Sequence, residues 1–179
     1  MDTSYNDHQL TFLYGRVQSG RGIATRHCQK HSKEIEAAVG RPIYPGSLNV
    51  ILDHPVRFSR AHAYPFDHGH RFLWHATLFG HPVCLYRWST IPLHICEIIA
   101  DVQLRSHFQL ADRAPVILAV DKRIPCRPNV ISRIGWLTLW LGRKRWYYDF
   151  DYYERLVRYY TWRVGAAQKP WNQSCADQK

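Results

Sequence analysis

The stretch Pro45-Gly46-Ser47-Leu48-Asn49-Val50-Ile51-Leu52 joins a Pro-Gly turn to an apolar strand. Because side chains alternate along a strand, Ser47, Asn49 and Ile51 share one face. Leu48, Val50 and Leu52 share the other face. A hydroxyl and an amide oxygen on one face suit a hard cation such as Mg²⁺, provided that the phosphates of a substrate supply negative charge. An ordinary hairpin strand with its polar face in water explains the same pattern. The stretch alone does not decide between these two interpretations.

Further short strands lie on both sides of this stretch. Each is a run of apolar, aromatic and β-branched residues bounded by turn residues. Many short strands with few short helices predict a mainly β fold, a small barrel. The predicted strands are Leu10–Val17, Arg71–Phe79, Val83–Trp88, Ile95–Ile99 and Pro115–Val120, the last of them fully buried.

Two short helices are predicted between the strands. Lys33–Val39 has Ser32 as a candidate N-cap and Gly40 just past its end. Val102–Phe108 has Asp101 as a candidate cap.

The character of the sequence changes after a linker rich in proline and basic residues, Asp121–Asn129. We therefore expect a barrel domain over residues 1–122, and a linker with a C-terminal extension over residues 123–179. The extension is aromatic and basic, and its residues 149–164 have the spacing of an amphipathic helix. We expect it to dock onto the barrel. Self-association or contact with an anionic membrane surface through residues 134–165 explains the pattern as well.

The composition indicates a globular protein without a membrane span. Hydrophobic residues make up 46% of the 179 residues, and no apolar run approaches the roughly 20 residues that a span requires. The N-terminus lacks the pattern of a signal peptide, so we expect a cytoplasmic protein, with a peripheral membrane association as an open alternative. Five cysteines without a Cys-x-x-Cys pair argue against a disulfide framework and a thiolate zinc site.

The formal net charge of +10 predicts a polyanionic partner. A nucleotide, an anionic membrane and nucleic acid all qualify, with nucleic acid the least favoured, and a solvated basic surface is the plainer interpretation. The segment Ser19–Ala24 contains Gly20, Arg21 and Gly22, and such a loop can turn backbone N–H groups toward an anion. A tight hairpin has the same composition, so this motif is weak by itself.

Three motifs taken together resemble the archaeal-type CTP-dependent riboflavin kinases. They are Arg16-Val17-Gln18-Ser19-Gly20-Arg21-Gly22, then Pro45-Gly46-Ser47-Leu48-Asn49-Val50, then Glu97-Ile98-Ile99-Ala100-Asp101-Val102-Gln103-Leu104-Arg105. They follow in the family's order and at similar intervals, and the resemblance covers about residues 10–121. It implies a six-stranded cradle-loop barrel with Greek-key character, which phosphorylates riboflavin to FMN with CTP and Mg²⁺ and releases CDP.

The resemblance also assigns residues to roles. Ser47 and Asn49 would hold the Mg²⁺ ion. Glu97 would be the catalytic carboxylate and would face the acceptor together with Thr90, or with Ser89 if the alignment gap lies elsewhere. The nucleotide would contact Gly20, Arg21, Gly22, Ile23, Ala24, Thr25, Val102, Gln103, Leu104 and Arg105.

The chain departs from the family pattern at several positions. Ala24 replaces the third glycine of the loop, Ser47 replaces a threonine, and Asp101 replaces a proline. Residues 53–88 match poorly, and the extension has no counterpart. Riboflavin is therefore less well supported as the acceptor than the phosphate transfer, and a related small hydroxyl compound is an alternative. A second hypothesis is a barrel without catalysis that binds an anionic partner through its basic tail.

Overall fold

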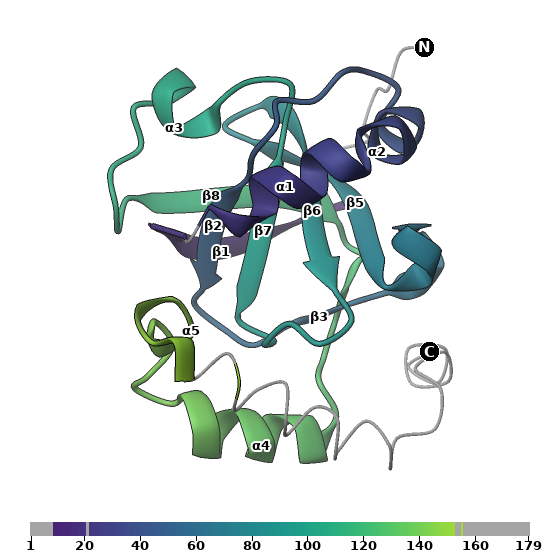
Figure 1. The fold of residues 1–179 in the computed structure, drawn as a ribbon. Coiled ribbons are helices and arrows are strands. Elements are labelled where there is room, and N and C mark those ends of the chain that lie inside the picture. The colour runs from purple at the N-terminus through teal and green to yellow at the C-terminus, as the bar shows by residue number, and fades with distance from the viewer. Residues whose placement is uncertain (1–8, 21, 153–154, 156–179) are drawn as a thin grey trace.

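The computed structural model describes residues 9–20, 22–152 and 155. The larger strands are β1 (Leu10–Gln18), β2 (Leu48–Leu52), β5 (Arg71–Leu78), β6 (His81–Trp88), β7 (Ile95–Ile99) and β8 (Pro115–Asp121). The short strands are β3 (Arg57–Phe58), β4 (Tyr64–Phe66) and β9 (Pro125–Cys126). The helices are α1 (Ile23–Lys30), α2 (Ser32–Val39), α3 (Leu104–His107), α4 (Val130–Trp140) and α5 (Trp146–Asp149) (Figure 1).

The six larger strands form a closed antiparallel barrel. Their order is β5-β6-β7-β2-β1-β8, and pairing of β5 with β8 closes the barrel. Strand β4 adds a seventh strand beside β5, and β3 pairs with β9 separately. The predicted mainly β fold with a six-stranded barrel is confirmed.

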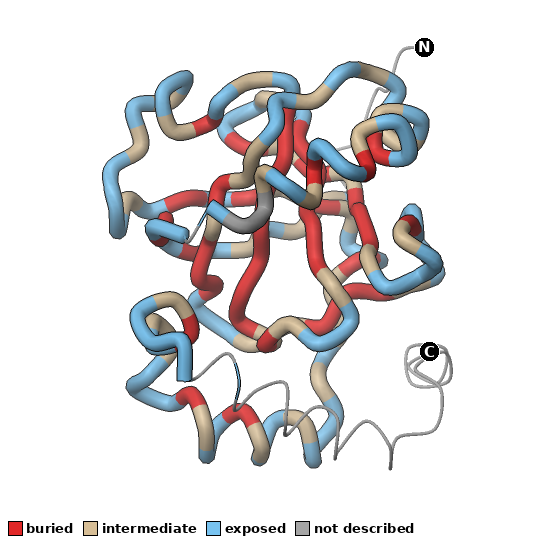
Figure 2. The backbone as a smooth tube through the Cα atoms, viewed as in Figure 1, coloured by how far each residue is buried: buried red, intermediate tan, exposed pale blue. Residues whose placement is uncertain are grey.

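Alternation along the strands separates an apolar interior from an outer face. In β2, Leu48, Val50 and Leu52 are buried inside the barrel, as their spacing predicts. The strand cores are buried along most of their length (Figure 2).

Helices cover two separate parts of the outer face. Cys28 of α1 and Ile35 of α2 pack in one cluster with Ile99 at the end of β7. Trp136 and Trp140 of α4 pack in a second cluster with Ile95 at the start of the same strand. In Figure 1, α1 crosses the barrel above, and α4 and α5 lie below. The middle of β7 therefore lies between two helical covers.

Some local predictions hold and others are wrong. Helix α2 ends at Gly40, whose φ of +77° is a conformation that favours glycine, but its N-cap is His31 and not Ser32. Asp101 does not cap α3, whose N-cap is Gln103. The Asp101 carboxylate instead accepts a hydrogen bond from His81, because the short β5–β6 hairpin brings that ring beside it.

Strand β8 is not fully buried. Its residues alternate between the barrel interior and the outer surface, and Ile117 is 46% exposed. No helix cluster covers this part of the outer face in the described residues. An apolar run thus predicted the strand correctly but not the exposure of its second face.

The extension contacts the barrel through α4. The Asn129 side chain caps this helix by accepting from the backbone N–H of Ser132 at 2.8 Å. The predicted helix over residues 149–164 falls mostly outside the described residues. In the described part, α5 ends at Asp149, Phe150 is extended, and Asp151, Tyr152 and Arg155 are helical. Within the described ranges, none of the helices has the length and apolar character needed to cross a bilayer.

Candidate functional site

A row of polar side chains crosses the barrel between the two helical covers. Gln18 on β1 lies opposite Asn49 on β2, and Asn49 lies opposite Glu97 on β7. Glu97 in turn lies opposite Tyr86 on β6. Directly opposite residues of adjacent strands present their side chains on the same face. We call Gln18, Asn49, Glu97 and Tyr86 the polar row.

Glu97 is the buried acid of this row. Only 7% of the residue is exposed, and the Ser47 hydroxyl donates to its Oε2 at 2.8 Å. Burial raises the pKa of Glu97 to about 7, whereas the hydrogen bond from Ser47 and the charge of Arg71 act in the opposite direction. The carboxyl group therefore exchanges its proton near neutral pH.

Ser47 and Asn49, the two predicted metal ligands, both neighbour Glu97. Because Ser47 directs its O–H toward the carboxylate, the lone pairs of its oxygen stay available to a cation. The Asn49 amide adds a second hard oxygen, the ligand type that Mg²⁺ prefers, and the Glu97 carboxylate lies beside both residues. The donor set thus fits a hard divalent cation. In the described part of the chain, histidine, cysteine and carboxylate side chains form no metal-binding group of three or more.

The glycine-rich loop runs against Asn49. A Cβ atom on Gly20 would lie 1.9 Å from Nδ2 of Asn49, far inside van der Waals contact. A side chain at position 20 would therefore force the Asn49 amide to move. The sequence identified the loop, and the structure shows that its first glycine passes close to Asn49.

The second half of the predicted loop is a helix. Gly22 has a φ of +71° and is the N-cap of α1, so that Ile23, Ala24 and Thr25 form its first turn. The free N–H groups of a first turn favour an anion, and this turn has no acidic residue. Arg21 lies outside the described residues. For Ile23 and Ala24 the structure describes the backbone only.

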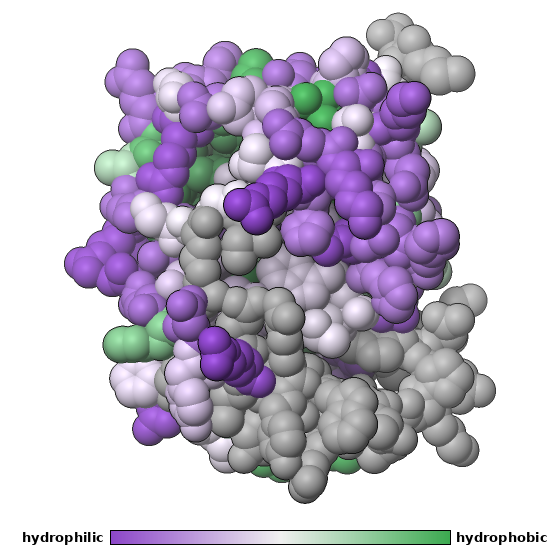
Figure 3. Space-filling model, viewed as in Figure 1, coloured by the Kyte–Doolittle hydropathy of each residue, from purple (hydrophilic) through white to green (hydrophobic). Residues whose placement is uncertain are grey.

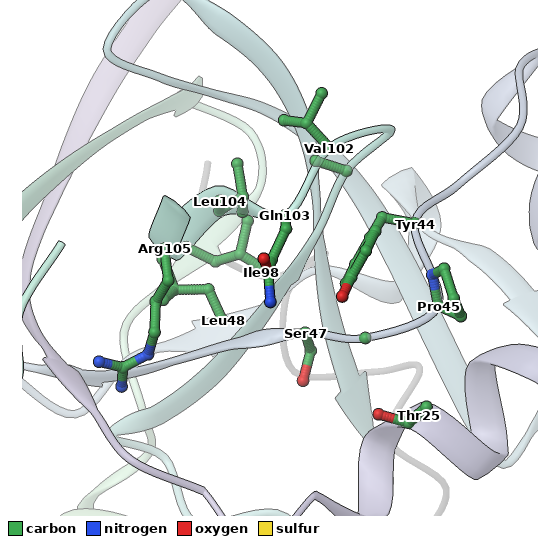
Figure 4. Close-up of a pocket in the computed structure, with 12 residues that line it drawn as sticks. Thr25, Tyr44, Pro45, Ser47, Leu48, Ile98, Val102, Gln103, Leu104 and Arg105 are labelled. Carbon is green, nitrogen blue, oxygen red and sulfur yellow. The ribbon is translucent and has the colours of Figure 1, made fainter. Parts of the chain in front are cut away.

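A pocket of about 180 Å³ opens beside Ser47. Figure 4 shows the hydroxyl groups of Thr25, Tyr44 and Ser47 and the Gln103 amide around this opening. Of the predicted nucleotide-binding residues, Val102, Gln103, Leu104 and Arg105 line this pocket together with Thr25, whereas Gly20 and Gly22 do not. Its full lining is Thr25, Tyr44, Pro45, Gly46, Ser47, Leu48, Ile98, Ala100, Val102, Gln103, Leu104 and Arg105.

Arg105 links this pocket to the start of the glycine-rich loop. Its Nη2 donates to Asp112 at 2.7 Å, and the Ser19 hydroxyl donates to the same carboxylate. These two hydrogen bonds, that from Ser19 first, lower the pKa of Asp112 below its usual value. A fixed carboxylate therefore joins residues 86 positions apart and holds the loop against α3.

The other end of the polar row contains residues that the sequence did not single out. Arg71 donates to the Tyr86 hydroxyl and, through Nε, to Asp67 at 2.8 Å. The charge of Arg71 also reaches Glu97. Residues 53–88 match the family poorly, so motif comparison gave no signal for Arg71 or Tyr86.

Thr90 is not among the residues that line the pocket or that lie opposite Glu97. Both Thr90 and its alternative Ser89 are exposed in the turn that follows β6. The β6 residue directly opposite Glu97 is Tyr86. The predicted contact of Thr90 with an acceptor stays a prediction.

The face of the molecule seen in Figure 3 is mixed in character where described residues are visible. Hydrophilic side chains gather over α1 and α2 (Figure 3).

Comparison with protein-family models and with curated proteins finds no match to this chain.

Proposed function

We propose that this protein transfers the terminal phosphoryl group of CTP to a hydroxyl group of riboflavin, giving FMN and CDP, or to a related small acceptor. The observation that carries the proposal is the contact of Ser47 with Glu97 beside Asn49, at the edge of the pocket. The motif that suggests a metal site and the motif that suggests a catalytic carboxylate thus converge on one point, although 50 residues separate Ser47 from Glu97.

The nucleotide would occupy the pocket between α3 and the first turn of α1. Gln103 and Arg105 offer donors to the base or the phosphates, and Val102 and Leu104 offer apolar contact. The α1 N-terminus at Thr25 favours the negative charge of the phosphates. The resemblance to the riboflavin kinases supplies CTP as the specific donor.

Ser47 and Asn49 would hold Mg²⁺, and Glu97 would orient the Ser47 hydroxyl from behind. When bound, the ion would neutralise charge on the phosphate oxygens. The arrangement resembles other phosphoryl-transfer sites in that it relies on positioning and electrostatics.

Glu97 would act as general base through its second carboxylate oxygen. The acceptor hydroxyl gives its proton to Glu97, and its oxygen forms a bond to the γ-phosphorus. The bond from the γ-phosphorus to the bridging oxygen breaks, and CDP leaves with that electron pair. A base with a pKa of about 7 is well matched to this proton transfer at neutral pH.

The direct test supplies CTP or ATP with Mg²⁺ and a panel of alcohols that includes riboflavin, and detects FMN and CDP. Formation of CDP that depends on an acceptor supports the proposal, and FMN formation identifies riboflavin. Absence of CTP turnover with every acceptor contradicts it. If the protein instead binds anionic vesicles in a strongly salt-dependent manner without turnover, the non-catalytic hypothesis for the basic tail is favoured.

A further inference from the structure

The C-terminal extension reaches the polar row. Arg145, in the turn between α4 and α5, donates from Nε to Oε1 of Gln18 at 3.0 Å, across 127 positions of sequence. Gln18 is the β1 residue directly opposite Asn49. The Arg145 guanidinium therefore contacts Gln18, the residue that lies opposite the candidate metal ligand Asn49.

The backbone that carries Arg145 is held firmly in place. The carbonyl of Lys144 accepts from Nε2 of the buried His94 at 3.0 Å, and Nδ1 of the same ring accepts from Trp136 at 2.8 Å. Lys144 in turn donates to the backbone carbonyl of Asp53. The position of the Arg145 backbone is thus set by the hydrogen bonds of the preceding residue, Lys144, to the barrel.

The guanidinium of Arg145 keeps donors available beside the glycine-rich loop. Arginine offers five N–H donors in a planar fork that matches phosphate oxygens. Among the residues that the structure describes, only Gln18 accepts a hydrogen bond from this side chain. The two N–H₂ groups at the end of the fork therefore have no acceptor in the described part of the chain.

The charges around the start of the loop are unbalanced. Ser19 and Arg105 contact the Asp112 carboxylate directly. Besides these hydrogen bonds, the positive charges of Arg105 and Arg145 both lower the pKa of Asp112. Two arginines and one carboxylate leave an excess of positive charge where the loop leaves β1. An anionic group of a ligand would neutralise this excess.

We infer that Arg145 binds the phosphate groups of the nucleotide, so that the C-terminal extension forms part of the phosphoryl-transfer site. This inference rests on the proposed function. The plainer interpretation is that Arg145 only tethers the extension to Gln18. The two interpretations differ in whether a substitution of Arg145 weakens the binding of the ligand's phosphate groups.

The test measures the affinities of CTP and of cytidine, each with Mg²⁺, for the full-length protein and its variants by calorimetry. The affinity for cytidine is also measured by its competition with CTP. In Arg145→Gln we expect CTP affinity to fall about 10- to 100-fold, the range of one lost hydrogen bond to a charged group, with cytidine affinity unchanged. Arg143→Gln is the matched control, because Arg143 lies in the same turn with its guanidinium over the Trp146 ring, and should stay within about twofold of wild type.

Equal CTP affinity in wild type and Arg145→Gln overturns the inference, and so does an equal loss for CTP and cytidine. If Arg145→Gln does not fold, Arg145→Lys decides, because lysine keeps a charged donor for Gln18 but loses the planar fork. Weaker CTP binding at an unchanged melting temperature supports the inference, and unchanged binding overturns it. A wild-type protein that binds no CTP overturns the proposed function itself. A wild type that binds CTP with an insensitive Arg145 overturns the inference alone.

Discussion

Asn49 on β2 and Glu97 on β7 lie directly opposite each other in an antiparallel strand pair, with both side chains on the outer face of the barrel. Ser47, two residues before Asn49, donates to the same Glu97 carboxylate. A hydroxyl, an amide and an acid thus meet between two helical covers.

The proposed role of Glu97 as a base predicts a rise of kcat with pH. The pKa of about 7 means that Glu97 is largely protonated at pH 6 and largely ionised at pH 8. We therefore expect kcat to increase about tenfold over this interval. In Glu97→Gln, kcat should be low and independent of pH, with nucleotide affinity changed much less. Steady-state kinetics with CTP across this range checks both points, and a wild-type rate in Glu97→Gln would refute the assignment.

Removal of the Asn49 amide should weaken binding of the metal–nucleotide complex. Asn49→Ala deletes one of two proposed ligand oxygens, so the affinity for CTP measured with Mg²⁺ should fall while that measured with EDTA changes little. Calorimetry under both conditions provides the comparison. Equal losses in the two conditions would mean that Asn49 contacts the nucleotide and not the ion.

A Cβ atom on Gly20 should displace Asn49. Because this Cβ would lie 1.9 Å from Nδ2 of Asn49, Gly20→Ala should cause the same loss of Mg²⁺-dependent CTP binding that we expect for Asn49→Ala. Gly135→Ala is the control, since a Cβ there meets nothing within 4 Å and the residue lies within α4. It should leave binding unchanged and raise the free energy of unfolding by up to about 1 kcal/mol. Normal CTP binding in Gly20→Ala would argue against a role for this close contact.

The Arg105–Asp112 ion pair should matter more for the ligand than for stability. Both side chains are about one-third exposed or more, so the free energy of unfolding in Arg105→Gln should change by less than about 1 kcal/mol. CTP affinity should fall about tenfold or more, because Arg105 lines the pocket. Chemical denaturation and calorimetry on the same preparation separate the two effects. A large loss of stability with normal CTP binding would assign Arg105 a structural role only.

His94 should make the protein sensitive to acid. Burial lowers its pKa to about 3 in the folded state, well below its usual 6.5. The unfolded chain therefore binds a proton more readily between these values, and the contribution of His94 to stability is complete above pH 6.5 and declines as the pH falls toward 3. From pH 6.5 to 5 the loss amounts to about 2 kcal/mol.

Glu97 contributes with the opposite sign between pH 4.5 and 7, because its folded pKa is raised. The measurement is therefore the difference between wild type and His94→Gln, which retains one donor and one acceptor. The wild type should lose about 2 kcal/mol more than the variant over the interval from pH 6.5 to 5. If the free energy of unfolding falls equally with pH in the two proteins, His94 is not the source of the acid sensitivity.

Local patterns predicted most of the barrel. Runs of apolar, aromatic and β-branched residues located β1, β5, β6, β7 and β8, and alternation in β2 placed Ser47 and Asn49 on the face opposite the core. Helix α1 was missed because Gly20 and Gly22 suggested a loop, and because Cys28 alone of its later residues is buried. The exposed face of β8 depends on which outer surfaces the helices cover, and a single strand carries no information on that point.

The site was predictable only in part, for a related reason. Motifs indicated Ser47, Asn49, Glu97 and the residues of the pocket, but alternation does not fix the register between β2 and β7. That register alone brings Asn49 opposite Glu97. Gln18 and Arg145 meet across the whole length of the barrel domain, and such a contact follows from topology and not from local sequence.

The alternation of β7 has a consequence for how this protein can change. Cys96 and Ile98 face the barrel interior, and Glu97 between them faces the polar row. Residues of the barrel interior and residues of the outer face therefore occupy alternate positions of one backbone. Libraries confined to polar outer-face positions such as Gln18 and Arg71 can search for new acceptors while the interior remains constant. Selection for specificity and selection for a packed interior then act on separate sets of codons.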